Sequence, residues 1–267
     1  MKTRIIAGLV ALPVLIFILL ANPEIFTVAV AIISIIGLLE FYKCTGVAQS
    51  KLLVATGIIA TIYMFVRDYF WLTLYGAELP LFVIILFLLV LTGHKKINIT
   101  HAALALFGVL YVAGLFLYAV KIKMYYLGGL YIWLVVLGAF MTDTFAYFTG
   151  VFLGRHKLCP EISPKKTVEG AIGGIAGCGL SFIVYGIILE KCFSLDVNYV
   201  NIFILGMVAS VVSMIGDLSA SIIKRHFGIK DYGNLIPGHG GILDRCDSLI
   251  MVAPVVYYFI ILIGIIK

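Results

Sequence analysis

Seven of the chain's 32 charged residues lie within the 27 positions 221–247, between two apolar segments. Ionisable side chains are costly near hydrocarbon, so such a cluster in an apolar chain indicates a functional site. Its cations, which could neutralise phosphates, are Lys224, Arg225, Lys230 and Arg245. Asp244 and Asp247 are three residues apart, so they share one face of any helix they begin and could share a Mg²⁺ ion there. A loop that only orients a membrane protein needs Lys and Arg, but it does not need these acids.

The residues just before this cluster have helical spacing. Asp217, Ser221 and Lys224 follow one another at i, i+4 and i+7, which places an acid, a hydroxyl and an amine along one helical stripe. At the other end of the cluster, His239 lies between glycines and is followed by Gly240 and Gly241. We interpret this histidine as a residue that binds phosphate or a nucleobase, or as one that positions the loop.

A second group of polar residues lies upstream. Asp143 falls inside a long apolar segment, where it either belongs to the site or pairs with a neighbouring helix as packing glue. Two cations and two hydroxyls then precede the next apolar segment, at Ser163, Lys165, Lys166 and Thr167. Phosphate oxygens bind well at a helix N-terminus, because free N–H groups and the helix dipole point outward there.

The two segments resemble the phosphatidate cytidylyltransferase, or CDP-diacylglycerol synthase, family. The downstream positions that match are Ser221, Lys224, Arg225, Lys230, Asp231, Gly233, Pro237, His239, Gly240, Gly241, Asp244, Arg245 and Asp247. The upstream match consists of Asp143-Thr144, Ser163-Pro164-Lys165-Lys166-Thr167 and Glu169-Gly170. Cys246 departs from the family pattern, but it is small and apolar enough to pack in place of the usual residue. The resemblance covers about the last 125 residues.

The resemblance implies a nucleotidyltransferase that joins CTP to phosphatidate and releases pyrophosphate. It implies Mg²⁺ bound by Asp217, Asp244 and Asp247, with room for a second cation, and Lys224 and Arg225 as further catalytic residues. The implied substrate-binding residues are Asp143, Ser163, Lys165, Lys166, Thr167, Ser221, Lys230, His239, Gly240, Gly241 and Arg245. No general base is required, because a phosphate monoester with a second pKa of about 6 is already largely dianionic at neutral pH.

Two other classes of protein stay open. A CTP-dependent polyprenol or phytol kinase would also need Mg²⁺ and cations, but it would transfer the γ-phosphoryl group to an alcohol. An ion-coupled transporter could use Asp143 and Asp217 for the coupling ion, although the chain lacks the inverted repeats common among transporters. Glycine spacing permits a homodimer, and no nucleic-acid partner is expected.

The elements that must position these residues are membrane helices. Hydrophobic residues make up 63% of the chain and charged residues 12%, about half of the usual 25% in soluble domains. Nine charge-free runs predict an all-α polytopic membrane protein, and they are 5–23, 25–39, 52–66, 79–94, 97–120, 124–142, 170–189, 197–216 and 248–266. The runs 25–39, 52–66 and 79–94 are short of the 17 to 25 residues of a typical span, so those helices extend past flanking charges or do not fully cross.

Nine helices with a cytoplasmic N-terminus would place fourteen of the nineteen Lys and Arg residues inside. The charged loops 154–169 and 223–247 would then face the cytoplasm, which suits a bacterial inner membrane. We expect residues 1–120 to form a transmembrane scaffold and residues 121–267 to form the catalytic region. We also expect the glycines at 170–177 to serve close helix packing and not a phosphate loop, since no GxxxxGK[ST] motif is present.

Overall fold

The computed structural model describes residues 2–70, 78–93, 97–235, 238 and 240–266. Contacts divide the chain into two compact units, which we call the first unit (residues 1–121 and 226–245) and the second unit (residues 122–225 and 246–267). Each is described separately. The prediction that residues 1–120 and 121–267 differ in function is a separate matter and stays a prediction.

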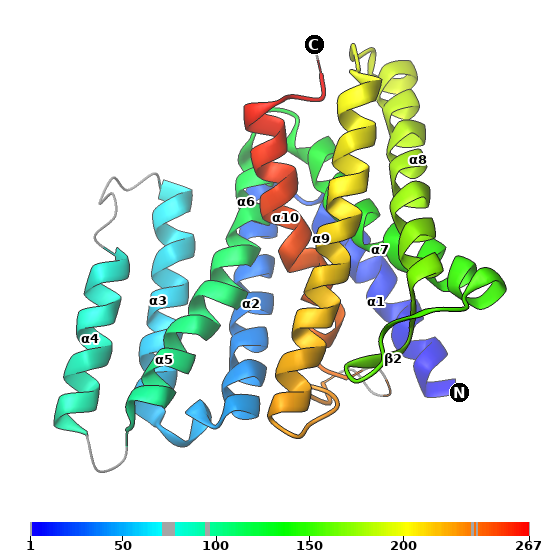
Figure 1. Ribbon diagram of the computed structural model, residues 1–267. Helices are drawn as coiled ribbons and strands as arrows, with labels where there is room; N and C mark the ends of the chain where they lie inside the picture. Colours follow the sequence, from blue (N-terminus) through cyan, green and yellow to red (C-terminus); the bar gives the residue numbers. More distant parts are fainter. Residues whose placement is uncertain (1, 71–77, 94–96, 236–237, 239, 267) are drawn as a thin grey trace. The chain divides into compact units, whose positions relative to one another are not determined.

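The chain is built almost entirely from helices (Figure 1). Those that begin in the first unit are α1 (Lys2–Leu20), α2 (Pro23–Thr45), η1 (Val47–Gln49), α3 (Lys51–Phe70), α4 (Glu78–Thr92), α5 (Ile99–Gly108), the π-helix η2 (Val109–Gly114), α6 (Leu115–Met124) and α10 (Leu243–Leu262). The remaining elements are α7 (Gly128–Leu153), β1 (Lys157–Cys159), β2 (Ser163–Thr167), α8 (Val168–Phe193) and α9 (Tyr199–His226).

Seven helical segments of the described chain are long and apolar enough to cross a membrane. They are α2, α3, the continuous α5–η2–α6, α7, α8, α9 and α10. The all-α polytopic membrane fold is therefore confirmed, whereas the count of nine and the cytoplasmic N-terminus stay predictions. The helices over the short runs 25–39 and 52–66 do extend past their flanking charges, to Thr45 and Phe70. The run 79–94 forms a 15-residue helix, α4.

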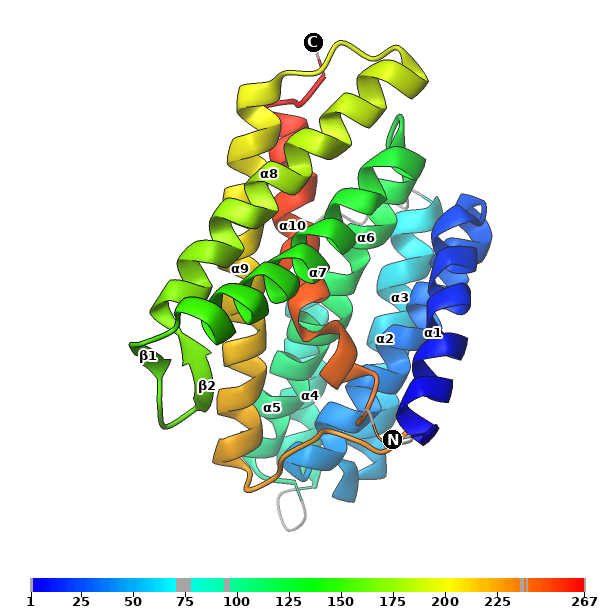
Figure 2. The same cartoon turned by 90° about the vertical axis from the view of Figure 1, so that its right-hand side faces the viewer.

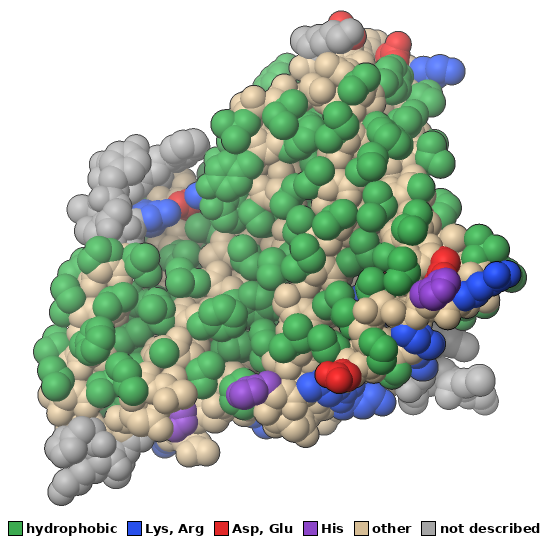
Figure 3. Space-filling model, viewed as in Figure 1, with side chains coloured by type: hydrophobic (Ala, Val, Ile, Leu, Met, Phe, Trp, Pro, Cys, Tyr) green, Lys and Arg blue, Asp and Glu red, His purple; other side chains and the backbone are tan. Residues whose placement is uncertain are grey.

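The outward faces of these helices suit a lipid environment. In Figure 3, hydrophobic side chains cover the middle of α8 and α9, while charged side chains gather near the helix ends. Ile172, Leu180 and Val184 are exposed along α8, and its charged residues Glu169, Glu190 and Lys191 lie near its two ends. An apolar belt between charged ends is the arrangement that a bilayer requires of a spanning helix.

In the first unit, α2 supplies the centre of the core. Leu38, Phe41 and Tyr42 on this helix are almost completely buried. The Tyr42 hydroxyl donates a hydrogen bond of 2.9 Å to the carbonyl oxygen of Ala105 on α5. Gly108 accepts the Phe41 and Tyr42 rings so closely that a Cβ there would lie 2.8 Å from each. Packing around one aromatic pair therefore fixes α2 against α5.

In the second unit, α7 and α8 pack closely against each other. A Cβ on Gly173 would collide with Thr149, and a Cβ on Gly177 would collide with the ring of Phe145. These glycines therefore allow α8 to approach α7, as the sequence predicted. The loop predicted at 154–169 is more ordered than expected, because it contains the antiparallel β1–β2 hairpin, which leads directly into α8 (Figure 2).

Candidate active site

Three helices of the second unit bring together three carboxylates, which we call the acidic cluster: Asp143 on α7, Asp217 on α9 and Asp247 on α10. Asp143 interacts electrostatically with Asp217, and Asp247 interacts with both of the others. Asp247 is only 8% exposed, whereas the Asp217 side chain is about one-third exposed. The prediction that Asp143 lies within a long helix is confirmed, and its neighbours are the two acids that the sequence placed far from it.

Close contact between α9 and α10 creates this arrangement. Gly216 precedes Asp217, and a Cβ on this glycine would lie 2.6 Å from the carbonyl oxygen of Asp247. One turn away, the Ser248 hydroxyl donates a 3.2 Å hydrogen bond to the carbonyl oxygen of Ser213. A glycine and two serines at the interface therefore let the two acid-bearing helices approach each other.

Two lysines offset the charge of the acidic cluster. Lys166 Nζ lies 2.5 Å from Asp217 Oδ2, and Lys224 attracts Asp247. Three carboxylates near one another repel unless cations lie between them, so the lysines stabilise the arrangement. The predicted stripe of Asp217, Ser221 and Lys224 lies entirely on α9, and so two of its members contribute to one charged site.

The hairpin that carries Lys166 is fastened to the start of α8. Thr167 is the N-cap of α8, with its hydroxyl accepting a 3.1 Å hydrogen bond from the Gly170 N–H. Glu169 accepts hydrogen bonds from the N–H groups of Arg155 and His156 and contacts the His156 ring. These bonds hold the residues just before β1, the strand that pairs with the Lys166 strand β2. Thr167 thus has a capping role, and substrate binding by Ser163, Lys165 and Thr167 stays a prediction.

The donor set of the acidic cluster fits a hard divalent cation, because Mg²⁺ prefers carboxylate oxygens. Among the described residues, no group of three or more Asp, Glu, His and Cys side chains is preformed as a metal site. Mg²⁺ commonly uses one or two carboxylates and takes its other ligands from water and substrate phosphates. Asp217 and Asp247 can supply the protein's share.

In the first unit, two further acids organise the segment before α10. Asp244 Oδ2 accepts hydrogen bonds from Tyr232 N–H (2.8 Å) and Gly241 N–H (3.0 Å). Glu40, near the end of α2, accepts one from Ile242 N–H (3.0 Å) and one from Leu243 N–H (2.9 Å). Asp244 therefore holds backbone in place, and its role as a metal ligand stays a prediction.

Sequence reasoning missed the task of Glu40. From its position, pairing with a cation and snorkelling at a helix end were equally reasonable interpretations. Its observed hydrogen-bond donors are instead backbone N–H groups about 200 positions away in the chain. The available signal was an acid that directly follows the charge-free run 25–39, but nothing in the sequence identifies backbone donors.

The remaining predicted cations are exposed. Arg225 is exposed near the end of α9, Lys230 is exposed in the segment that follows, and Arg245 is exposed in the first turn of α10. Gly240, with a φ of +86°, lies close to the Asp244 carboxylate. His239 and Pro237 lie outside the described residues.

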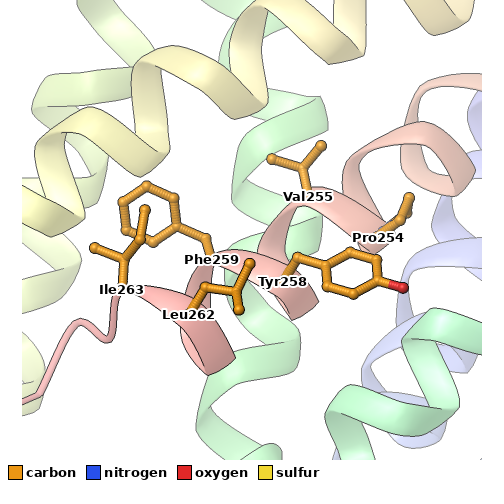
Figure 4. Close-up of a pocket in the computed structure, with 6 residues that line it drawn as sticks. All are labelled: Pro254, Val255, Tyr258, Phe259, Leu262 and Ile263. Atoms are coloured by element: carbon orange, nitrogen blue, oxygen red, sulfur yellow. The ribbon is translucent and has the colours of Figure 1, made fainter.

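An open hollow on α10 differs in character from the acidic cluster (Figure 4). Its lining residues are Pro254, Val255, Tyr258, Phe259, Leu262 and Ile263. The lining carries no ionisable acid or amine, so it cannot hold phosphate or a metal ion. The acidic cluster is therefore the better candidate for a site that binds phosphate or a metal ion.

The helices of this membrane protein bring carboxylates and lysines together. Such a site suits an enzyme that acts on phosphate groups. The sequence model of the cytidylyltransferase family matches residues 2–263, so the chain belongs to this family. The resemblance inferred from the motifs and the class of nucleotidyltransferase are thereby confirmed.

Individual relatives agree over most of the chain. A phosphatidate cytidylyltransferase of Bacillus subtilis is 34% identical over 272 residues, 98% of each chain. One of Staphylococcus epidermidis is 33% identical over 269 residues, which are 98% of this chain and 99% of the relative. One of Thermotoga maritima is 40% identical over 136 residues, half of each chain. The first four helices, which carried no motif, are thus included in the similarity.

Proposed function

We propose that the chain is a phosphatidate cytidylyltransferase, which converts CTP and phosphatidate into CDP-diacylglycerol and pyrophosphate. The observation that carries the proposal is the acidic cluster with Lys166 and Lys224 beside it. Negatively and positively charged side chains side by side suit a reaction between two anions, because the acids can hold a cation while the lysines hold phosphates. The names of the bacterial relatives supply the substrates.

In this reaction, an oxygen of the phosphatidate phosphate attacks the α-phosphorus of CTP. The new P–O bond forms as the bond from the α-phosphorus to the bridging oxygen breaks, and pyrophosphate leaves in line. The nucleophile is already ionised at neutral pH, so no side chain has to remove a proton. The protein's task is therefore to position two anions and to stabilise the added charge.

Asp217 and Asp247 would hold Mg²⁺, with Asp143 contributing negative charge nearby. When bound, the ion supplies charge neutralisation at the phosphate oxygens. Asp244 is proposed as a further ligand from its spacing to Asp247, and a second cation is compatible with the number of acids.

The cations have separate tasks in this proposal. Lys166 pairs with Asp217 and can pass to a phosphate oxygen of CTP, since an ammonium group rotates freely on a flexible stem. Lys224 neutralises phosphate beside Asp247. The exposed Arg225 and Arg245 are suited to bidentate contacts with phosphate groups.

We also propose that the acidic cluster faces the cytoplasm of a bacterial inner membrane. The excess of Lys and Arg on the side of the loops 154–169 and 223–247 favours this orientation. The substrates support it as well, because CTP is cytoplasmic and phosphatidate is a membrane lipid.

Products of labelled CTP test the proposal. Purified protein in phosphatidate-containing micelles with Mg²⁺ should transfer an α-phosphate label to lipid and release a γ-phosphate label as pyrophosphate. Transfer of the γ label to added polyprenol, with release of CDP, would instead indicate a lipid kinase. No CTP turnover with any lipid would favour a transporter.

A further inference from the structure

Both carboxylate oxygens of Glu40 accept hydrogen bonds at the N-terminus of α10. Oε1 accepts from Ile242 N–H and Oε2 accepts from Leu243 N–H, the residue at which α10 begins. The first N–H groups of a helix have no partner within the helix, and the positive end of the helix dipole favours an anion. A side chain of α2 thus takes the place of a local N-cap for a helix that begins about 200 residues later.

Two glycines of the family signature fit around this carboxylate. A Cβ on Gly233 would lie 2.5 Å from Glu40 Oε1. A Cβ on Gly241 would also collide with the Glu40 carboxylate. Neither glycine has a positive φ, so the need for glycine arises from the space that Glu40 occupies and not from backbone conformation.

Asp244 completes the same arrangement from the other side. Its carboxylate accepts hydrogen bonds from both Tyr232 N–H and Gly241 N–H, so these two positions of the chain are held by one side chain. Glu40 fastens the next two N–H groups along the chain. Four backbone donors before and at the start of α10 are therefore held by two carboxylates.

We propose that Glu40 is a positioning residue for the cytidylyl transfer, acting through the backbone of Gly241 to Leu243. This inference rests on the proposed function. Glu40 fixes the direction in which α10 begins and the course of the glycines predicted to contact phosphate. It does not touch the reacting atoms.

Steady-state kinetics of Glu40 variants test the inference. Misplacement of a catalytic element by about 1 Å can cost about 10²-fold in rate, so we expect a loss of about that size in kcat/KM for Glu40→Ala. Part of this loss should be a raised KM for CTP, which a smaller fraction of folded protein cannot produce. Glu40→Gln keeps one acceptor oxygen and should recover part of the activity. The matched control is Glu24→Gln, an exposed acid in the first turn of the same helix, which should behave as the parent.

A second variant tests the contact independently. Gly233→Ala should lower kcat/KM in the parent, because its Cβ would displace the Glu40 carboxylate. In the Glu40→Ala background the space is open, so the same substitution should have almost no further effect. Additive losses from the two substitutions would overturn the inferred contact.

Amide hydrogen exchange separates this inference from the proposed function. Peptides covering residues 240–246 should exchange faster in Glu40→Ala than in the parent, with or without CTP. Unchanged exchange would overturn the backbone role of Glu40, and faster exchange with parental kcat and KM would overturn its positioning role. A parent without cytidylyl transfer would overturn the proposed function and the catalytic part of the inference, while the exchange rates would still decide whether Glu40 holds the backbone.

Discussion

The acidic cluster of the second unit and the pair Glu40 and Asp244 of the first unit have different partners. In the second unit, Asp217 and Asp247 lie near a third acid and are balanced by Lys166 and Lys224. In the first unit, the carboxylates of Glu40 and Asp244 accept hydrogen bonds from four backbone N–H groups. Acids that gather near one another attract cations, whereas acids that accept from backbone donors fix a chain segment.

This difference in partners distinguishes acids suited to bind a cation from acids that hold the backbone. Mutual repulsion within the acidic cluster is relieved by any added cation, so the cluster favours binding of a metal ion or a lysine. Hydrogen bonds from the backbone to a carboxylate need no cation, and they stabilise one conformation of the segment. Substitutions should therefore have different signatures in the two units.

The largest effect is expected for Asp217→Asn and Asp247→Asn. Loss of a carboxylate that would hold Mg²⁺ should lower CDP-diacylglycerol formation by about 10³-fold, because charge stabilisation at the phosphates is lost. Asp196→Asn, in the connection between α8 and α9, is the matched control and should retain activity. Near-parental turnover in either cluster variant would show that the cluster is not catalytic.

Asp244→Asn should have the next largest effect and decides between the two tasks of this residue. The amide oxygen of Asn can still accept from Tyr232 N–H and Gly241 N–H, so the segment should keep its conformation. We expect a loss of about 10²-fold in kcat if the carboxylate also binds metal. Activity within a factor of about two of the parent would leave Asp244 with backbone support alone.

Lys166→Met should lower activity by about 10- to 100-fold, since a hydrogen bond to a charged group contributes about 1.5–3 kcal/mol. Lys166→Arg should retain part of the activity, because it keeps the charge. Initial rates at saturating and limiting CTP measure both variants. The control is Lys191→Met, in the last turn of α8, which should leave these rates unchanged. An equal loss of activity in this control would indicate a general effect on folding.

The smallest effect concerns stability. Gly177→Ala forces a methyl group against the ring of Phe145, and overpacking of this kind costs about 1–3 kcal/mol. Thermal unfolding in detergent should show a lower midpoint. Gly129→Ala, whose Cβ would meet nothing within 4 Å, should leave the midpoint unchanged or raise it. A midpoint for Gly177→Ala equal to that of the parent would contradict the close packing of α7 on α8.

Local sequence patterns predicted much of this organisation. Apolar runs predicted the helices, glycine spacing predicted close helix packing without identifying the partner helix, and the spacing of Asp217, Ser221 and Lys224 predicted a stripe on one helix. The pairing of Lys166 with Asp217 was not predicted, because it depends on the hairpin that the sequence suggested only as a loop. Glu40 could not be assigned either, since its hydrogen bonds join positions about 200 residues apart and no side-chain pattern records a backbone donor.

The binding of Mn²⁺, used in place of Mg²⁺ and followed by electron paramagnetic resonance, tests the role of the acidic cluster most directly. Purified parent protein with CTP should bind Mn²⁺ at the cluster, and Asp247→Asn should bind it at least about tenfold more weakly, because a ligand and a negative charge are lost. Glu40→Gln should bind it nearly as well as the parent, since its carboxylate serves the backbone. Equal Mn²⁺ affinity in the parent and in Asp247→Asn would contradict the assignment of the cation to the acidic cluster.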